Sequence, residues 1–173
     1  IVAQLMLKSG QVGQAVVAFR TAHDKENSLT TLVSMTTAKV AAGDGNGAVS
    51  DLRQWLERKP ADYGIRAALA FALIELGRYD EAVVENEKLL VHWQASPIVL
   101  NNLAWLYERR GDARALPLAK RAYDIAPDSP AVMDTYGYLL VRAGDAEGGL
   151  ALLSQAYPAS QKAPAIGYHL AVA

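Results

Sequence analysis

Aromatic and arginine side chains recur along this sequence at a fixed spacing, and they are its best candidates for a functional surface. Phe71, Trp105 and Tyr138 follow one another at intervals of 34 and 33 residues. Arg109 and Arg142 each stand four residues after one of these aromatic residues. Aromatic rings supply large apolar contact areas, and a guanidinium pairs well with a carboxylate. The pattern therefore favours a surface that binds a partner segment over a catalytic centre.

Other candidates for chemistry are weak. The sequence has no cysteine, and its three histidines, His23, His92 and His169, stand at unrelated places and do not form a metal-ligand pattern. The segment 44–47 begins like a calcium-binding loop but lacks the later ligands of such a loop. No nucleophile and base stand in a recognisable arrangement. We expect no metal, no cofactor and no enzymatic activity.

The charge balance and the apolar runs limit the partners. Lys and Arg number 17 and Asp and Glu 18, so the net charge is −1 and no basic face for nucleic acid is expected. The longest apolar run, Ala67–Ile74, is far too short for a membrane span. The sequence opens with Ile1 and shows no signal peptide, so we expect a fragment of a longer protein whose targeting signal is unknown.

The elements that must position the aromatic residues follow from a repeat of glycines. One glycine occurs every 33 or 34 residues, at Gly10, Gly43, Gly77, Gly111 and Gly144. Each follows a helical apolar pattern, where a glycine ends a helix by entering the left-handed region. Asp44, Asp112 and Asp145 come directly after three of these glycines and are expected to cap the next helix.

Small residues recur within the same period. They stand four or five residues after each glycine, at Ala15, Ala48, Ala82, Ala115 and Gly149. Small side chains let two helices approach closely, so the repeated unit is a helix, a tight turn and a second helix.

Pro117 interrupts one of these second helices. If Asp112 caps the helix, Pro117 is its fifth residue, where the missing N–H costs a hydrogen bond. We expect this helix to begin late or to bend.

This pattern resembles the tetratricopeptide repeat (TPR). The resemblance implies an all-α fold, a right-handed superhelical solenoid of antiparallel helix pairs. It predicts a single array over residues 1–173 with eleven helices. The units are a partial one at 1–28, complete ones at 29–62, 63–96, 97–129 and 130–163, and a partial one at 164–173.

The resemblance also implies which residues face the concave groove, namely positions 2, 5, 9, 12 and 13 of each unit. Positions 5, 9 and 13 give a candidate binding surface for a protein or peptide partner. Its residues are Phe71, Asn101, Trp105, Arg109, Asp134, Tyr138, Arg142 and Tyr168. Asn101 is expected to hydrogen-bond the partner backbone. The alternative is that the aromatic residues pack between neighbouring helices and that the arginines favour the helix C-terminal dipole.

The stretch from Asn101 to Ala173 resembles a narrower family. Its motifs, such as Asn-Asn-Leu-Ala-Trp-Leu-Tyr and Asp-Thr-Tyr-Gly-Tyr-Leu-Leu, are similar to those of bacterial TPR lipoproteins associated with exosortase, PEP-CTERM sorting and exopolysaccharide production. This resemblance implies a scaffold for export or assembly in the bacterial periplasm or cell envelope.

Three hypotheses for the function remain open. The first is an interaction scaffold that binds a partner in the groove. The second is the TPR region of a larger enzyme, such as a glycosyltransferase. The third is a structural spacer that self-associates through uncapped ends. The apolar residues expected at these ends are Ile1, Val2, Leu5, Ile166, Leu170 and Val172.

Overall fold

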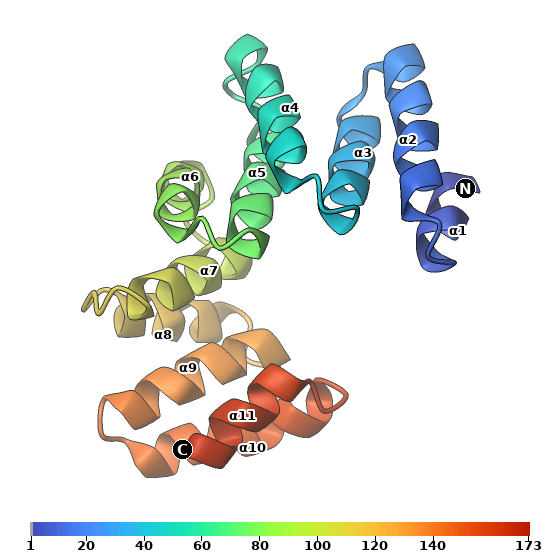
Figure 1. The fold of residues 1–173 in the computed structure, drawn as a ribbon. Helices are drawn as coiled ribbons and strands as arrows, with labels where there is room; N and C mark the ends of the chain where they lie inside the picture. The colour runs from blue at the N-terminus through green and yellow to red at the C-terminus, as the bar shows by residue number, and fades with distance from the viewer. Residues whose placement is uncertain (1) are drawn as a thin grey trace. The chain divides into compact units, whose positions relative to one another are not determined.

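The structure, a computed structural model, describes residues 2–173, and this part of the chain is entirely helical (Figure 1). It contains eleven helices and no β-strand, in agreement with the sequence-based prediction. The helices are α1 (Val2–Lys8), α2 (Val12–Glu26), α3 (Leu29–Ala41), α4 (Gly45–Arg58), α5 (Tyr63–Glu75), α6 (Tyr79–His92), α7 (Pro97–Glu108), α8 (Ala115–Ile125), α9 (Pro130–Arg142), α10 (Ala146–Ala159) and α11 (Pro164–Val172). None of the described helices is both long enough and apolar enough to cross a membrane.

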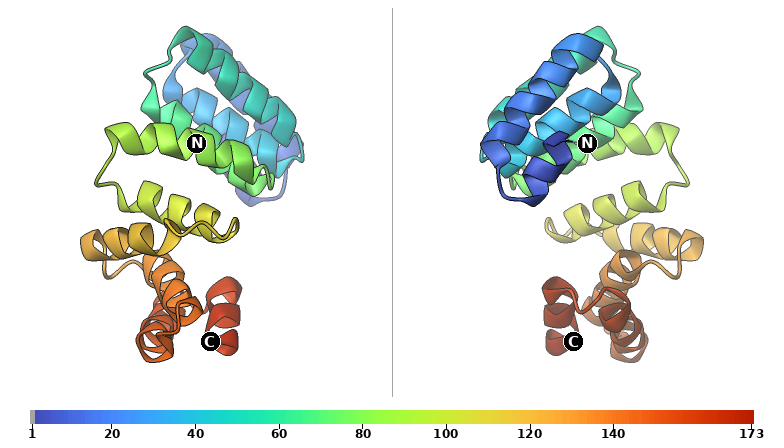
Figure 2. Two further views of the ribbon diagram at one scale, coloured as in Figure 1. Left: turned by 90° about the vertical axis from the view of Figure 1, so that its left-hand side faces the viewer. Right: turned by 90° about the vertical axis from the view of Figure 1, so that its right-hand side faces the viewer.

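The helices form two compact units, and the division between them falls within α6. The first unit ends at Glu85 and the second begins at Asn86. Consecutive helices within a unit run in opposite directions, as α2 and α3 do in the first unit and α9 and α10 in the second (Figure 1). Figure 2 shows α11, coloured red, beside the pair that precedes it, and it packs on both α9 and α10.

The repeated glycines end the first helix of each pair as predicted. All five of the glycines have a positive φ, between 65° and 96°. In the turn after α3, the amide of Asp44 donates to the carbonyl of Lys39 at 2.8 Å, which closes the helix end behind Gly43. The Asp44 carboxylate then accepts from the amide of Gly47 at 3.0 Å and caps α4. Asp145 caps α10 through Gly148 in the same way.

The prediction that Asp112 caps its helix is wrong. The helix α8 begins at Ala115, and the Asp112 carboxylate accepts instead from the amide of Arg114 at 2.9 Å. The late start makes Pro117 the third helical residue, and the first four N–H groups of a helix have no intrahelical partner in any case. The expected late start of α8 is therefore confirmed, and it explains why Asp112 has another role.

Small residues lie where the two helices of a pair cross. Ala15, Ala48, Ala82, Ala115 and Gly149 are all buried. The closest approach is that of α9 and α10, where a Cβ added at Gly149 would lie 2.5 Å from the carbonyl oxygen of Gly137. The two backbones therefore touch at this crossing, because neither residue carries a side chain.

The apolar residues expected at the two ends differ in exposure. Val2 and Leu5 on α1 are 64 % and 60 % exposed, while Ile166 on α11 is buried in a cluster with Met133 and Ala156. Leu170 is half-buried, and Val172 is exposed. Ile1, the sixth of these residues, lies outside the described part of the chain.

The contact between α9 and α10 predicts opposite effects for two glycine-to-alanine substitutions. Gly149→Ala should lower the free energy of unfolding by about 1–3 kcal/mol, because the new methyl group overlaps backbone atoms. The control is Gly13→Ala in α2, where a Cβ meets nothing within 4 Å. Since alanine favours a helix over glycine, this control should raise the stability by up to about 1 kcal/mol. Chemical denaturation followed by circular dichroism measures both. Equal effects of the two substitutions would contradict the close crossing.

Candidate functional site

Three first helices of the second unit bring four of the eight predicted site residues, Trp105, Arg109, Tyr138 and Tyr168, to one cavity. This α7–α9–α11 cavity has a volume of about 200 Å³. Its lining residues are Trp105, Glu108 and Arg109 from α7, Thr135, Tyr138 and Leu139 from α9, and Tyr168 and His169 from α11. The repeat explains this grouping, because residues one period apart on successive first helices lie side by side.

Trp105 is half-buried at this cavity and is neither a core residue nor a fully exposed one. The guanidinium of Arg109, one turn later on α7, lies 4.9 Å from the centroid of the Trp105 ring. A cation over an indole face is a favourable contact. It keeps the exposed Arg109 beside the cavity.

Arg142 does not line the cavity but is bound to two residues that do. Its Nη1 atom donates to the Glu108 carboxylate at 3.1 Å and to the Tyr138 hydroxyl at 3.3 Å. Glu108 and Arg142 are 34 residues apart, so this ion pair joins equivalent ends of α7 and α9. The chain itself therefore supplies the carboxylate that the sequence analysis expected from a partner.

His169 joins α11 to α9. Its Nδ1 atom lies 2.8 Å from a carboxylate oxygen of Asp134, and its ring stacks on Tyr138 with centroids 4.4 Å apart. Asp134 is buried. Burial raises the pKa of its carboxyl group above the ordinary value of 3.8, and the hydrogen bond from His169 acts in the opposite direction. The sequence analysis considered His169 only as a metal ligand and did not predict this contact.

Asn101 and Tyr168 differ from the residues around them. The Oδ1 atom of Asn101 is buried and accepts no hydrogen bond within residues 2–173, and Asn101 is not among the residues that line the cavity. Tyr168 is 65 % exposed and forms part of the cavity wall, with its ring centroid 6.0 Å from that of His169. Tyr168 therefore offers the most accessible ring of this cavity.

Phe71 belongs to a separate cavity in the first unit. This α3–α5 cavity has a volume of about 370 Å³, and its walls include Val33, Thr37 and Val40 from α3 together with Phe71 and Glu75 from α5. The Phe71 ring is 59 % exposed. Phe71 and Glu75, at positions 9 and 13 of their unit, line this cavity, and Trp105 and Arg109, at the same two positions, line the α7–α9–α11 cavity.

Four lining residues of the α7–α9–α11 cavity were not among the predicted site residues, namely Glu108, Thr135, Leu139 and His169. Glu108 stands at position 12 of its unit, one of the positions that the resemblance assigns to the groove. Thr135 and His169 stand at position 6 and Leu139 at position 10, outside the assigned set. Within residues 2–173, no three His, Asp or Glu side chains are grouped so that they could hold a metal ion.

The raised pKa of Asp134 predicts a pH-dependent contribution to stability. A group whose pKa is higher in the folded state stabilises the fold most below its ordinary pKa and loses that contribution as the pH rises. The free energy of unfolding of the wild type should therefore fall relative to that of Asp134→Asn as the pH rises above 3.8. Denaturation of both proteins at a series of pH values measures this difference. A constant difference, or one that increases with pH, would contradict the assignment.

Comparison with known proteins agrees with the fold. Residues 2–162 match the family described as Tetratricopeptide repeat. No curated protein matches the chain. Solved structures that resemble it include a thermophilic TPR protein from Thermus thermophilus, with 16 % identity, a TM-score of 0.75 and coverage of 99 % of this chain and 94 % of that one. Another is MamA, residues 41 to the end, from Desulfovibrio magneticus RS-1, with 18 % identity, a TM-score of 0.72 and coverage of 92 % of each chain.

A third similar structure is a TPR protein from Parabacteroides merdae ATCC 43184. It has 17 % identity and a TM-score of 0.75, and the match covers 98 % of this chain and 67 % of that one. At such identities the likeness concerns the fold alone. The family match, however, spans nearly the whole sequence and agrees with the glycine period, the helix pairs and the small residues at their crossings. The chain belongs to the tetratricopeptide repeat family.

Proposed function

We propose that this TPR chain is an interaction scaffold and that it binds a segment of a partner protein at the α7–α9–α11 cavity. The observation that supports this most is the exposure of aromatic rings on three successive first helices, at Trp105, Tyr138 and Tyr168. Residues that served only as core would be covered by their neighbours. Partly exposed aromatic rings are also the residues that most often dominate binding at protein interfaces.

The groups around the rings determine what kind of segment fits. Arg109 is exposed beside Trp105 and lines the cavity, whereas Arg142 pairs with Glu108 and is not among the lining residues. An apolar side chain of the partner, placed in the cavity between Trp105 and Tyr138, would gain most from burial. A carboxylate next to it would gain from Arg109. The site is therefore suited to a segment in which an apolar residue is followed or preceded by an acidic one.

The α3–α5 cavity is suited to a second apolar side chain. Apart from Glu75 and two threonines, its walls are aliphatic or aromatic. Exposed Phe71 supplies the largest contact area there. This cavity carries no arginine or lysine, so it should bind an apolar residue without selecting an acidic neighbour.

The cellular role that we propose is scaffolding in export or in exopolysaccharide assembly at the bacterial envelope. Its support is the similarity of residues 101–173 to TPR lipoproteins associated with exosortase. We propose further that this chain has no catalytic role of its own. The alternative, a catalytic domain elsewhere in the full-length protein, is tested by reading the complete open reading frame.

Self-association is the alternative that a specific observation favours. Val2 and Leu5 expose apolar side chains on one short helix, α1. If this face joins two copies, Leu5→Glu should convert a dimer to a monomer, because it places a charge in an apolar contact. The neighbouring exposed Gln4→Glu introduces the same charge and serves as control. Light scattering at increasing concentration measures the mass. A wild type that stays monomeric would contradict this alternative.

The scaffold proposal predicts a selective effect of Trp105. A peptide selected from a random library against the immobilised protein serves as the probe. Trp105→Ala should weaken its binding at least about tenfold, or roughly 1.4 kcal/mol, because the ring is the central anchor of the cavity. The matched control is Trp93→Ala, which removes a partly exposed tryptophan that does not line the cavity.

Calorimetry on both variants measures the affinity, and thermal unfolding measures their stability. Equal weakening by the two substitutions would contradict the proposal. So would a Trp105→Ala variant that loses thermal stability and keeps its affinity, since that result identifies the ring as a packing residue.

A further inference from the structure

A second cavity of the first unit lies on the opposite side of α3 from the α3–α5 cavity. This α2–α4 cleft has a volume of about 310 Å³ and is bounded by α2, α3 and α4. Among its lining residues are Arg20 and His23 from α2, Lys39 from α3, and Asp51, Trp55 and Arg58 from α4. The α3 residues of the two cavities differ, so a ligand of the cleft need not compete with a segment in the α3–α5 cavity.

Lys39 is the residue that sets this cleft apart from the rest of the repeat. It is only 7 % exposed. In the next three TPR repeats, which begin at residues 63, 97 and 130, the same position holds Leu73, Tyr107 and Leu140. The first two of these are buried and the third is half-buried. The next three TPR units therefore carry leucine or tyrosine at this position, with the Tyr107 hydroxyl donating to Glu87, and the unit 29–62 carries a cation.

The burial of Lys39 is accommodated by Asp51. The Nζ atom donates to the Asp51 carboxylate and lies 4.0 Å from that of Asp44. A buried ion pair is often no more stabilising than apolar side chains of similar volume. Leucine at this position would fit the pattern of the later units without any need for a partner. Stability alone thus gives no reason for the lysine, and departures from a local pattern are expected at functional sites.

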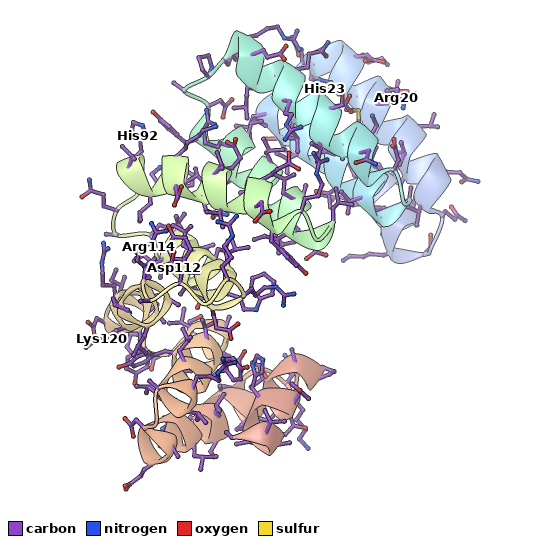
Figure 3. The ribbon with its side chains drawn as sticks, turned by 60° about the vertical axis from the view of Figure 1, so that its left-hand side comes forward. Arg20, His23, His92, Asp112, Arg114 and Lys120 are labelled. Carbon is purple, nitrogen blue, oxygen red and sulfur yellow. The ribbon has the colours of Figure 1, made fainter. Side chains whose placement is uncertain are left out.

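Two arginines face the same cleft with unused donors. Arg20 has no ion pair or hydrogen bond within the described residues, and Figure 3 labels it beside His23 on α2. Arg58 donates from Nε to the carbonyl of Gln54, its own backbone neighbour one turn earlier, and has no carboxylate partner in residues 2–173. Guanidinium groups bind phosphate and carboxylate through paired N–H donors.

The charges of the cleft sum to a positive value. Lys39 and Asp51 balance each other. Arg20 and Arg58 remain, opposed by Asp24, which also lines the cleft. The ring of His23 stands 6.1 Å from that of Trp55, and its Nδ1 contacts the Thr31 hydroxyl at 3.1 Å. These two rings give the cleft an aromatic wall beside its cationic groups.

From this arrangement, we propose that the α2–α4 cleft binds a small organic anion through a phosphate or carboxylate group. The oxyanion lies between Arg20 and Arg58, and buried Lys39, whose charge is balanced by Asp51, offers it a further N–H donor. The volume of about 310 Å³ exceeds that of an oxyanion alone and is at the lower end of the range for small-molecule pockets. The remainder of the ligand therefore packs against Trp55 and His23.

The test is a titration followed by nuclear magnetic resonance. Glycerol 3-phosphate and succinate are the two probes, and sodium chloride of equal ionic strength is the reference. The proposal expects saturable shifts of the amide signals of α2, α3 and α4 and of the Trp55 indole N–H with at least one probe. The probe that binds more tightly identifies phosphate or carboxylate as the preferred group. No saturable shift with either probe would overturn the proposal.

Two substitutions separate a site from general charge attraction. Arg20→Gln should weaken binding at least about tenfold. The matched control, Lys25→Gln, removes one positive charge from an exposed residue of the same helix that does not line the cleft, and it should change the affinity less than about twofold. Equal weakening by both would overturn the proposal.

A double substitution separates ligand binding from packing. Lys39→Leu combined with Asp51→Leu replaces both partners of the ion pair by apolar side chains, so it should keep or raise the melting temperature while it weakens binding at least about tenfold. Unchanged affinity with a higher melting temperature would show that Lys39 is only a packing residue and would overturn the proposal. If this variant does not fold, the comparison of Arg20→Gln with Lys25→Gln still decides, since both residues are exposed.

Discussion

The contact on which each helix pair depends is the close approach of its two helices at a small residue. At α9 and α10 this contact joins two backbones, because a Cβ at Gly149 would overlap the carbonyl oxygen of Gly137. Alanine takes the same place in the other pairs. Once two helices cross at a fixed residue, the turn between them must close at a fixed length, and the left-handed glycine provides it. The period of the repeat follows from these two requirements, and the period decides which side chains meet on neighbouring first helices.

The parts of the fold that depend on the period were predictable from the sequence. The positive φ of the glycines and the late start of α8 followed from single residues with a strong local preference, and the number of helices followed from the resemblance to the TPR. Asp112 shows the limit of such reasoning, because Pro117 moved the start of α8 beyond the reach of that cap. Side-chain pairs between neighbouring TPR repeats were harder to predict from the sequence. Glu108 with Arg142 and Asp134 with His169 are 34 and 35 residues apart, and no local pattern indicates which long side chain turns toward which.

The ion pair of Glu108 with Arg142 changes the interpretation of the two arginines. From the sequence, arginines at equivalent positions of two TPR repeats suggest a binding site for an acidic partner. The structure gives the two arginines different surroundings, since Arg142 has a carboxylate within the chain and Arg109 lies over the Trp105 ring. Exposed ion pairs contribute little to affinity, whereas apolar burial contributes more. In the proposed function, the aromatic rings therefore determine how strongly a segment binds, and Arg109 determines which segment is preferred.

The helix α3 shows how one repeat can carry two different surfaces. Residues such as Val33 and Thr37 face the α3–α5 cavity, and Lys39 faces the α2–α4 cleft, because positions two or six residues apart point to different sides of a helix. The period constrains the residues at the crossings and leaves the remaining positions free to vary between units. A buried lysine in place of leucine is costly unless a partner neutralises it, and Asp51 does so from α4. Such a paired substitution preserves the packing of the repeat and at the same time gives one cleft polar groups that a leucine at this position would not supply.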